Sequence, residues 1–318
     1  MNNLVRLIGR RLIALPIMVV GVTFLVFFLM SFSKIDPAQN ALGEGATAEA
    51  LAQYREEYGL NRHWFIRFID FFRGMLHGDL GTYGARRDSV AAKVADAFPV
   101  TIQLTLLGLL IAVVVAAILG VLAALYRDRW PDQAIRVFSI ACIATPSFWL
   151  AVLMILVFST SLELLPASGK LIPFSEDPSA WAARMAMPAI ALGVPVAGSL
   201  TRVIRTAMVE ELDKDYVRTA LGAGVPKSVV VSRNVLRNAL ITPVTVLGLR
   251  IGYLMGGAVV IEVIFNLPGM GMAILDGVTS NEPTLVQGVT VVVALAFVLV
   301  NIVVDLLYIL INPRIRTV

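Results

Sequence analysis

The stretch Val100–Tyr126 reads VTIQLTLLGLLIAVVVAAILGVLAALY and carries no charged residue over 27 positions. An apolar run of 18 or more residues predicts a helix that crosses roughly 30 Å of hydrocarbon. Lipid offers no partners for backbone N–H and C=O groups, and a helix pairs these groups internally. This stretch therefore indicates a protein that is embedded in a membrane.

The rest of the chain repeats this pattern. Of its 318 residues 58% are hydrophobic and only 15% are charged, and the mean hydropathy is +0.82. A soluble domain cannot cover that much apolar surface with so few charges. Five further apolar blocks are Leu12–Phe32, Ala134–Ser159, Ala186–Met208, Leu240–Val263 and Leu285–Ile311. The predicted fold class is an all-α membrane protein with about six transmembrane helices.

The distribution of lysine and arginine predicts the orientation of these helices. With the N-terminus inside, the two short outer loops carry only Lys170 and Arg184. The inner segments carry Arg6, Arg10, Arg11, Arg127, Arg129, Arg136, Arg202, Arg205, Lys214, Arg218, Lys227, Arg233, Arg237, Arg314 and Arg316. Short loops rich in lysine and arginine stay in the cytoplasm, so both termini are predicted to be cytoplasmic. The first block then acts as an uncleaved signal anchor.

Three regions follow from this topology. Residues 1–33 form the signal-anchor helix, residues 34–99 a large helical extracytoplasmic loop, and residues 100–318 a core of about five transmembrane helices. Within the loop, Thr47 is expected to cap a helix that runs to Tyr58. An amphipathic helix near Trp64–Met75 is expected on the membrane surface or on top of the bundle. A further short helix is expected over Ser89–Phe98.

The sequence lacks the common signatures of enzymes. It contains no GxxxxGK[ST] phosphate loop, no GxSxG elbow and no HExxH zinc motif. His63 and His77 do not have the spacing of metal ligands, and the single cysteine, Cys142, excludes an internal disulfide. We therefore predict no catalytic residue, no metal site and no cofactor in this chain. The basic pI of about 9.4 reflects membrane topology, so no nucleic-acid partner is expected.

Arg250 is the charged residue placed clearly deep in a predicted span, where charge is costly and marks a functional position, and Asp305 lies roughly two turns before the end of the last span. Arg250 and Asp305 are expected at similar depth, and we hypothesise that they pair. Alternatively, Asp305 binds backbone or water while Arg250 faces a wet pathway. On the helix of Arg250 the small residues Gly248, Gly252 and Gly256 form a face that permits close helix packing. This fifth helix is therefore expected to be central.

The loop 209–239 between the fourth and fifth spans is patterned as two helices. Asp215 suits a helix start, and Gly224 before Val225-Pro226 suits a stop. Ala220 and Gly224 lie one turn apart and make a small-residue face suited to docking into a groove on another protein. The second helix, Lys227–Ala239, carries three basic residues that are expected to meet lipid head groups.

The stretch Arg218-Thr219-Ala220-xxx-Gly224 resembles the Glu-Ala-Ala-xxx-Gly loop of binding-protein-dependent ABC importer permeases, in the variant of dipeptide, oligopeptide and nickel permeases. Other segments similar to this family are Tyr58-Gly59-Leu60, Gly78-Asp79-Leu80-Gly81, Thr145-Pro146-Ser147-Phe148-Trp149, Gly257-Ala258-Val259-Val260-Ile261-Glu262, Phe265-Asn266-Leu267-Pro268-Gly269-Met270-Gly271, Asp305-Leu306-Leu307-Tyr308 and Asn312-Pro313-Arg314-Ile315-Arg316. Departures from the family pattern are Arg218-Thr219 for Glu-Ala, Gly222 for a basic residue and Arg237 for proline.

The resemblance implies a type I ABC importer-like permease in the bacterial plasma (inner) membrane that carries peptides or similar small solutes. Its coupling helix, which docks on an ATPase, is expected to contain Asp215, Tyr216, Arg218, Thr219, Ala220 and Gly224. The implied partners are a second related permease, two ATPase subunits that bind ATP and Mg, an extracytoplasmic solute-binding protein and membrane lipid. The alternative is an ion-coupled secondary transporter, which predicts paired intramembrane carboxylates and internal repeats. A membrane enzyme is the least favoured class.

Overall fold

The computed structural model describes residues 2–32, 36–43, 45–84 and 86–311, and it describes side chains in these ranges except at 2–12, 40–41 and 305–311. The chain forms two compact units. Unit 1 comprises residues 1–5, 102–266 and 300–318, and unit 2 comprises residues 6–101 and 267–299. The segment Asn312–Arg316, which carries one of the family-like motifs, lies outside the described residues.

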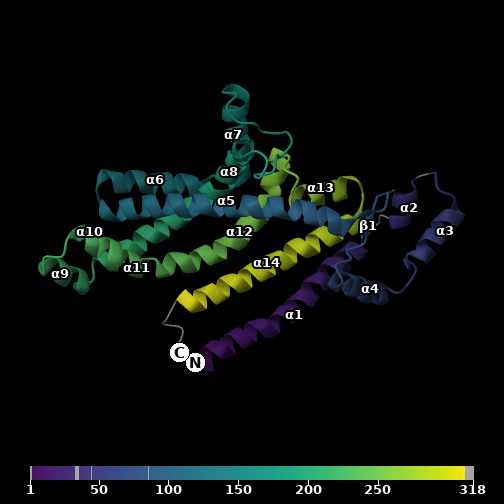
Figure 1. Cartoon of the computed structure of the whole chain (residues 1–318), viewed down its shortest axis with the longest axis horizontal. Helices are drawn as coiled ribbons and strands as arrows, with labels where there is room; N and C mark the ends of the chain where they lie inside the picture. Colours follow the sequence, from purple (N-terminus) through teal and green to yellow (C-terminus); the bar gives the residue numbers. More distant parts are fainter. Residues whose placement is uncertain (1, 33–35, 44, 85, 312–318) are drawn as a thin grey trace. The chain divides into compact units, whose positions relative to one another are not determined.

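Five of the described helices are long and apolar enough to cross a membrane. They are α1 (Asn2–Ser31), α5 (Val90–Leu125), α8 (Pro178–Leu212), α12 (Ile241–Phe265) and α14 (Pro283–Ile311) (Figure 1). A sixth candidate is a bent pair that is formed by α6 (Trp130–Ala144) and by α7 (Ser147–Met154) with the π-helical segment η1 (Ile155–Ser161). The predicted all-α membrane fold with about six spans is confirmed.

The predicted span Ala134–Ser159 is not one continuous helix, because the chain bends by 98° between α6 and α7, as in a broken span or a re-entrant loop. Thr145 caps α6 with extended backbone angles, φ −88° and ψ 115°. The residue before a proline is pushed out of the helical region by the proline ring, and Pro146 follows directly. One hydropathy block therefore contains two helices.

Residues 36–89 of unit 2 hold three short helices and a small hairpin. These are α2 (Pro37–Leu42), α3 (Ala48–Glu57), α4 (Trp64–Leu76), β1 (Thr82–Tyr83) and β2 (Asp88–Ser89), with the two strands antiparallel. The Thr47 side chain accepts a hydrogen bond from the Ala50 N–H at 3.2 Å, so the predicted cap is confirmed. Phe68 of α4 packs edge-on against Phe24 of α1, with ring centroids 5.4 Å apart. This contact fastens α4 to the first membrane helix.

The predicted separate helix over Ser89–Phe98 is wrong. After β2 the chain enters α5 at Val90 and continues as one helix through Pro99. The helix loses one backbone hydrogen bond at Pro99 but does not end there. The hydropathy pattern also left out α13 (Met270–Thr279), whose first N–H, on Met270, donates to the Thr101 hydroxyl at 2.9 Å. The core of unit 2 is made by Leu80, Val90, Ala97, Met270, Ala273, Leu285 and Val289.

Unit 1 is organised around α8. Two thirds (67%) of the most apolar window of α8 is buried within this chain, against 33% for α12, so α8 is the more buried of the two helices, and the central place of the fifth helix in the assembled importer stays a prediction. Gly108 and Gly120 of α5 meet α8 at residues 192–193 and 201–204, so α5 and α8 are parallel. Helix α6 runs antiparallel to α8, because Asp132 contacts Arg205 while Ser139 and Cys142 lie against Gly198. Helix α12 is also antiparallel to α8, because Arg250 contacts Ser199 while Gly257 lies against Leu192.

Glycine allows this close approach at particular positions. A Cβ at Gly193 would lie 2.5 Å from the carbonyl oxygen of Gly108, a backbone atom that cannot swing away. On α12, a Cβ at Gly248 would lie 2.1 Å from Val304 Cγ1 of α14, whereas a Cβ at Gly256 would meet nothing within 4 Å. Gly252 is buried and Gly256 is exposed. The predicted glycine face of α12 is therefore packed at Gly248 and open at Gly256 in this chain.

Replacing Gly193 by alanine should lower the midpoint of thermal unfolding of the detergent-purified protein. The added methyl group forces α5 and α8 apart, and overpacking of this kind costs about 1–3 kcal/mol. Gly256→Ala is the matched control, because its methyl group enters open space and alanine favours the helix. If the two variants unfold at the same temperature, the α5–α8 contact is not as close as described.

Candidate functional site

The segment that follows α8 forms a compact helical cap at the end of this helix (Figure 1). It contains α9 (Asp215–Gly222), α10 (Lys227–Val229), the π-helical segment η2 (Val230–Val235) and α11 (Leu236–Ala239). Helix α9 ends at the predicted glycine, because Gly224 has the left-handed φ of +80°. The Gly224 N–H donates to the Leu221 carbonyl and the Val225 N–H to the Ala220 carbonyl. This pair of bonds is a Schellman stop, which glycine adopts without strain.

The inner face of α9 is held by apolar packing. Val217 is 4% exposed, and Tyr216 and Ala220 pack beside it against the same core. The buried members of this core are Ala116, Ala124, Leu200, Ile204, Met208, Val217, Val230, Val235 and Ala239. The Tyr216 hydroxyl donates to Glu211 Oε1 at 2.9 Å, and burial raises the pKa of this phenol, so it stays a donor. Side-chain packing and one directed hydrogen bond thus fix α9 on α8.

The outer face of α9 is open. Asp215 and Arg218 have side chains that are 97% and 74% exposed, and Thr219 is exposed beside them. Leu221, Val225 and Val229 add exposed apolar side chains. We call Arg218, Thr219, Leu221, Gly224, Val225 and Val229 the α9 patch. Ala220 is half-buried and faces the core, so it does not share one face with the exposed Gly224 as the spacing had predicted.

Two ion pairs connect α8 and its cap to the start of α6. Arg127 Nη1 donates to Asp213 Oδ2 at 2.8 Å, and this hydrogen bond raises the pKa of Arg127. Both groups are about half exposed, so solvent screens the pair and its contribution to stability is small. In contrast, Asp132 has a side chain that is 0% exposed and accepts two 2.6 Å hydrogen bonds from Arg205, which is 18% exposed. The two parallel bonds form the bidentate geometry that makes arginine–carboxylate pairs strong and specific.

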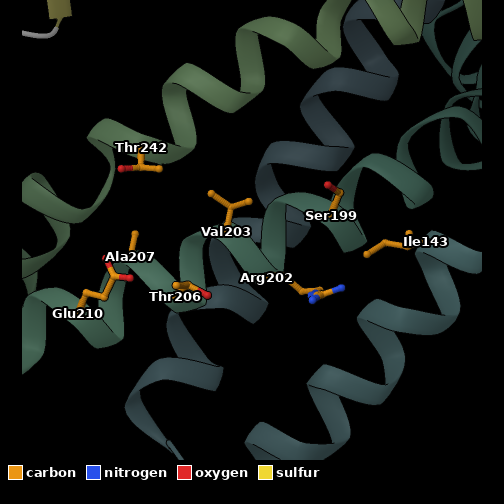
Figure 2. A pocket seen from close by; sticks show the side chains of 8 residues that line it. All are labelled: Ile143, Ser199, Arg202, Val203, Thr206, Ala207, Glu210 and Thr242. Atoms are coloured by element: carbon orange, nitrogen blue, oxygen red, sulfur yellow. The ribbon is translucent and has the colours of Figure 1, made fainter.

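A groove follows the exposed face of α8. Six of its side chains come from this helix, flanked by Ile143 of α6 and Thr242 of α12 (Figure 2). The six are Ser199, Arg202, Val203, Thr206, Ala207 and Glu210. We call these eight residues the α8 groove, and its volume is about 390 Å³. An adjoining hollow of about 430 Å³ shares Ala207, Glu210 and Thr242 and continues to Tyr216.

Arg202 was expected from the sequence only as a basic residue of the inner side, and Glu210 was given no site role. The available signal was spacing, since Arg202, Thr206 and Glu210 recur every four residues and therefore share one face of a helix. Hydropathy averaging hid this signal because the opposite face of α8 is apolar and buried. Charged residues that share one face of a predicted span thus indicate a polar surface. The mean hydropathy of the whole span does not indicate this surface.

Of the two predicted intramembrane charges, Arg250 adjoins this groove. Its Nη2 donates to Ser199 Oγ at 2.9 Å, and the side chain is half-buried. Asp305 belongs to α14, but its side chain lies outside the described residues, so the hypothesis of an Arg250–Asp305 pair stays a prediction. Another arginine, Arg184, is 3% exposed and donates to the backbone carbonyls of Ala167, Phe265 and Asn266. It thereby neutralises the carbonyl end of α12.

Five helices of membrane-spanning length among the described residues, with the short exposed helix α9 after α8, define the class of multi-pass membrane proteins. The chain belongs to the family of binding-protein-dependent transport system inner membrane components, whose model matches residues 116–317. A model of the N-terminal part of such membrane components matches residues 4–105. The protein is thus the permease subunit of an ATP-binding-cassette importer, a multi-pass inner membrane protein and a transport subunit rather than an enzyme.

Named relatives align with almost the whole length of this chain. A protein of Brucella abortus (strain 2308), named as a peptide transport system permease, is 37% identical over 95% of this chain and 96% of its own length. One of Escherichia coli (strain K12), named as a D,D-dipeptide transport system permease, is 34% identical over 97% of both chains. The glutathione transport system permease protein GsiC of Salmonella choleraesuis (strain SC-B67) is 35% identical over 96% of this chain and 97% of its own length. These matches favour the importer over the ion-coupled alternative.

Replacing Asp132 by alanine should destabilise the purified protein by about 3 kcal/mol, because it leaves Arg205 partly buried without its counter-charge. Arg127→Ala, which breaks the exposed pair with Asp213, should cost much less, because solvent screens that pair. The double change Asp132→Leu with Arg205→Leu should recover most of the lost stability, since no lone charge is left. Equal loss in Asp132→Ala and Arg127→Ala, measured by thermal unfolding, would contradict the buried pair.

Proposed function

We propose that this chain forms the translocation pathway of an importer for peptides or similar small solutes, together with a second related permease. The solute class is supported by the names of three relatives, which refer to peptide, D,D-dipeptide and glutathione transport. The α8 groove supports a polar solute, because its walls offer hydroxyl groups and both signs of charge. Permeases of this family work with ATPase and solute-binding partners, and two ATPase subunits would bind the ATP and Mg outside this chain.

Helix α9 is the proposed coupling helix. This proposal rests on the different environments of the two faces of α9. Val217 and Tyr216 fix the inner face to the chain, whereas Arg218 and Leu221 on the outer face are exposed. A helix fixed to its own subunit by one face and open on the other transmits force when a partner grips the open face. The exposed apolar side chains of the α9 patch are of the kind that protein interfaces bury.

The proposed orientation places both termini and the α9 patch in the cytoplasm, with residues 34–99 outside. It rests on the strong excess of lysine and arginine in the segments that would then face the cytoplasm. Lys227, Arg233 and Arg237 flank the return to the membrane and suit contact with lipid head groups. An ATPase partner in the cytoplasm requires this orientation of α9.

Substitution of Gly224 by tryptophan tests the coupling role. The bulky side chain would block close docking, so solute uptake and solute-stimulated ATPase activity of the assembled importer should fall at least about tenfold. Gly224→Asn is the matched control, because asparagine tolerates a left-handed φ and adds little bulk. Both variants should reach the membrane in normal amounts. Normal uptake by the tryptophan variant would remove α9 from the coupling role.

Cysteine labelling tests the orientation. Cys142 is the only cysteine and is 6% exposed, so Cys142→Ala provides a background without reactive thiols. In that background Lys214→Cys should react with a membrane-impermeant maleimide only in inside-out vesicles, because Lys214 precedes α9. Glu56→Cys, at an exposed position of α3, should react only in right-side-out vesicles or intact spheroplasts. The reverse pattern would invert the proposed topology.

A further inference from the structure

The charges of the α8 groove point to a specific ligand chemistry. Arg202 and Glu210 are both exposed, and among the described residues neither makes an ion pair or a side-chain hydrogen bond. In the predicted topology Arg202 lies near the cytoplasmic end of the fourth span and Glu210 at the start of the loop 209–239, where charged side chains reach water or polar groups. This face of α8 is therefore turned toward water or toward polar groups that are not part of this chain.

The geometry of the two charges is fixed by the helix. Eight residues separate Arg202 from Glu210, which corresponds to about 12 Å along the axis of α8. Figure 2 shows Thr206 between them on the same face, with the Ser199 and Thr242 hydroxyl groups at the margins. The groove thus presents a cation, a row of neutral hydrogen-bonding groups and an anion in that order. Its volume of about 390 Å³ falls within the range of small-molecule sites.

We propose that the α8 groove is a subsite for a short zwitterionic peptide in extended form, with its carboxylate against Arg202 and its ammonium against Glu210. This inference rests on the proposed function and deepens it. An extended chain spans at most about 3.3–3.6 Å per residue, so three to four residues are needed to cover the axial spacing of about 12 Å between the backbone positions of Arg202 and Glu210. The guanidinium group donates two parallel hydrogen bonds to a carboxylate. Thr206 is placed to contact the peptide backbone between the two ends.

The position of Arg250 supports this assignment. Its guanidinium group is held by Ser199 at one end of the groove, so a second positive charge lies near the end where the carboxylate is placed. At the other end the neighbouring basic residue, Lys214, is already paired with Glu211. The groove is therefore electrically polarised along α8, and a ligand with separated opposite charges matches that polarity in only one direction.

The test uses the assembled importer in proteoliposomes and tri-alanine as the probe. Arg202→Gln and Glu210→Gln should each lower the initial uptake rate at low peptide concentration about tenfold or more, the loss expected for a charge-assisted hydrogen bond. Arg129→Gln and Glu176→Gln are matched controls at exposed positions outside the groove and should transport normally. ATPase activity stimulated by the solute-binding protein should persist in all four variants, because the α9 patch is unchanged.

Occupancy of the groove is measured separately. In the Cys142→Ala background, Thr206→Cys should be alkylated more slowly when tri-alanine is present, and Arg202→Gln should remove this protection. If the wild-type importer takes up tri-alanine but the groove variants match the controls, the inference is overturned while the proposed function stands. If the wild-type importer takes up no peptide, the proposed function itself fails. If the groove variants dissociate the complex on size exclusion, the groove is an interface with the second permease and the inference is overturned.

Discussion

Close packing of α8 against its neighbours is the constraint on which unit 1 depends. Gly193 and Gly198 let α5 and α6 approach to backbone contact, and the Asp132–Arg205 pair fixes the rotation of α6 about its own axis. Helix rotation decides which residues of α8 are buried. With the apolar side turned toward α5 and α6, the row Arg202, Thr206 and Glu210 is left open to form the groove. The polar surface is thus a consequence of where the glycines lie.

The groove and the docking helix are connected through two consecutive residues of α8. Glu210 lines the groove, and Glu211 accepts the hydrogen bond from Tyr216 of α9. A displacement of α9 that is transmitted through Tyr216 therefore reaches the groove within one peptide unit. No long pathway of side chains is required, because a packed helix moves as a body and interior packing resists local deformation. This arrangement would give a direct physical link between the partner proposed to hold α9 and the solute proposed to bind on α8.

Sequence reasoning succeeded where the controlling physics is local. Hydropathy located the membrane helices, Thr47 marked a helix start, and Gly224 marked the end of α9. It failed where the outcome depends on contacts between distant segments. Nothing near Asp132 in the sequence indicates that Arg205, 73 positions away, is its partner. Spacing placed Ala220 beside Gly224, but the inward rotation of α9 is set by Val217, which is buried in a core whose other buried residues come from α5, α8, η2 and α11.

The bend at Pro146 separates the sequence constraints on α7 and η1 from those on α6. It turns α7 and η1 away from the line of α6, and no residue of η1 is buried within this chain. Mutations in Ile155–Ser161 therefore change side chains on the surface of the chain and leave the packing of α8, which carries Arg202 and Glu210, undisturbed. A surface segment of this kind can adapt to a new lipid environment or neighbouring subunit while the packing around α8 stays unchanged.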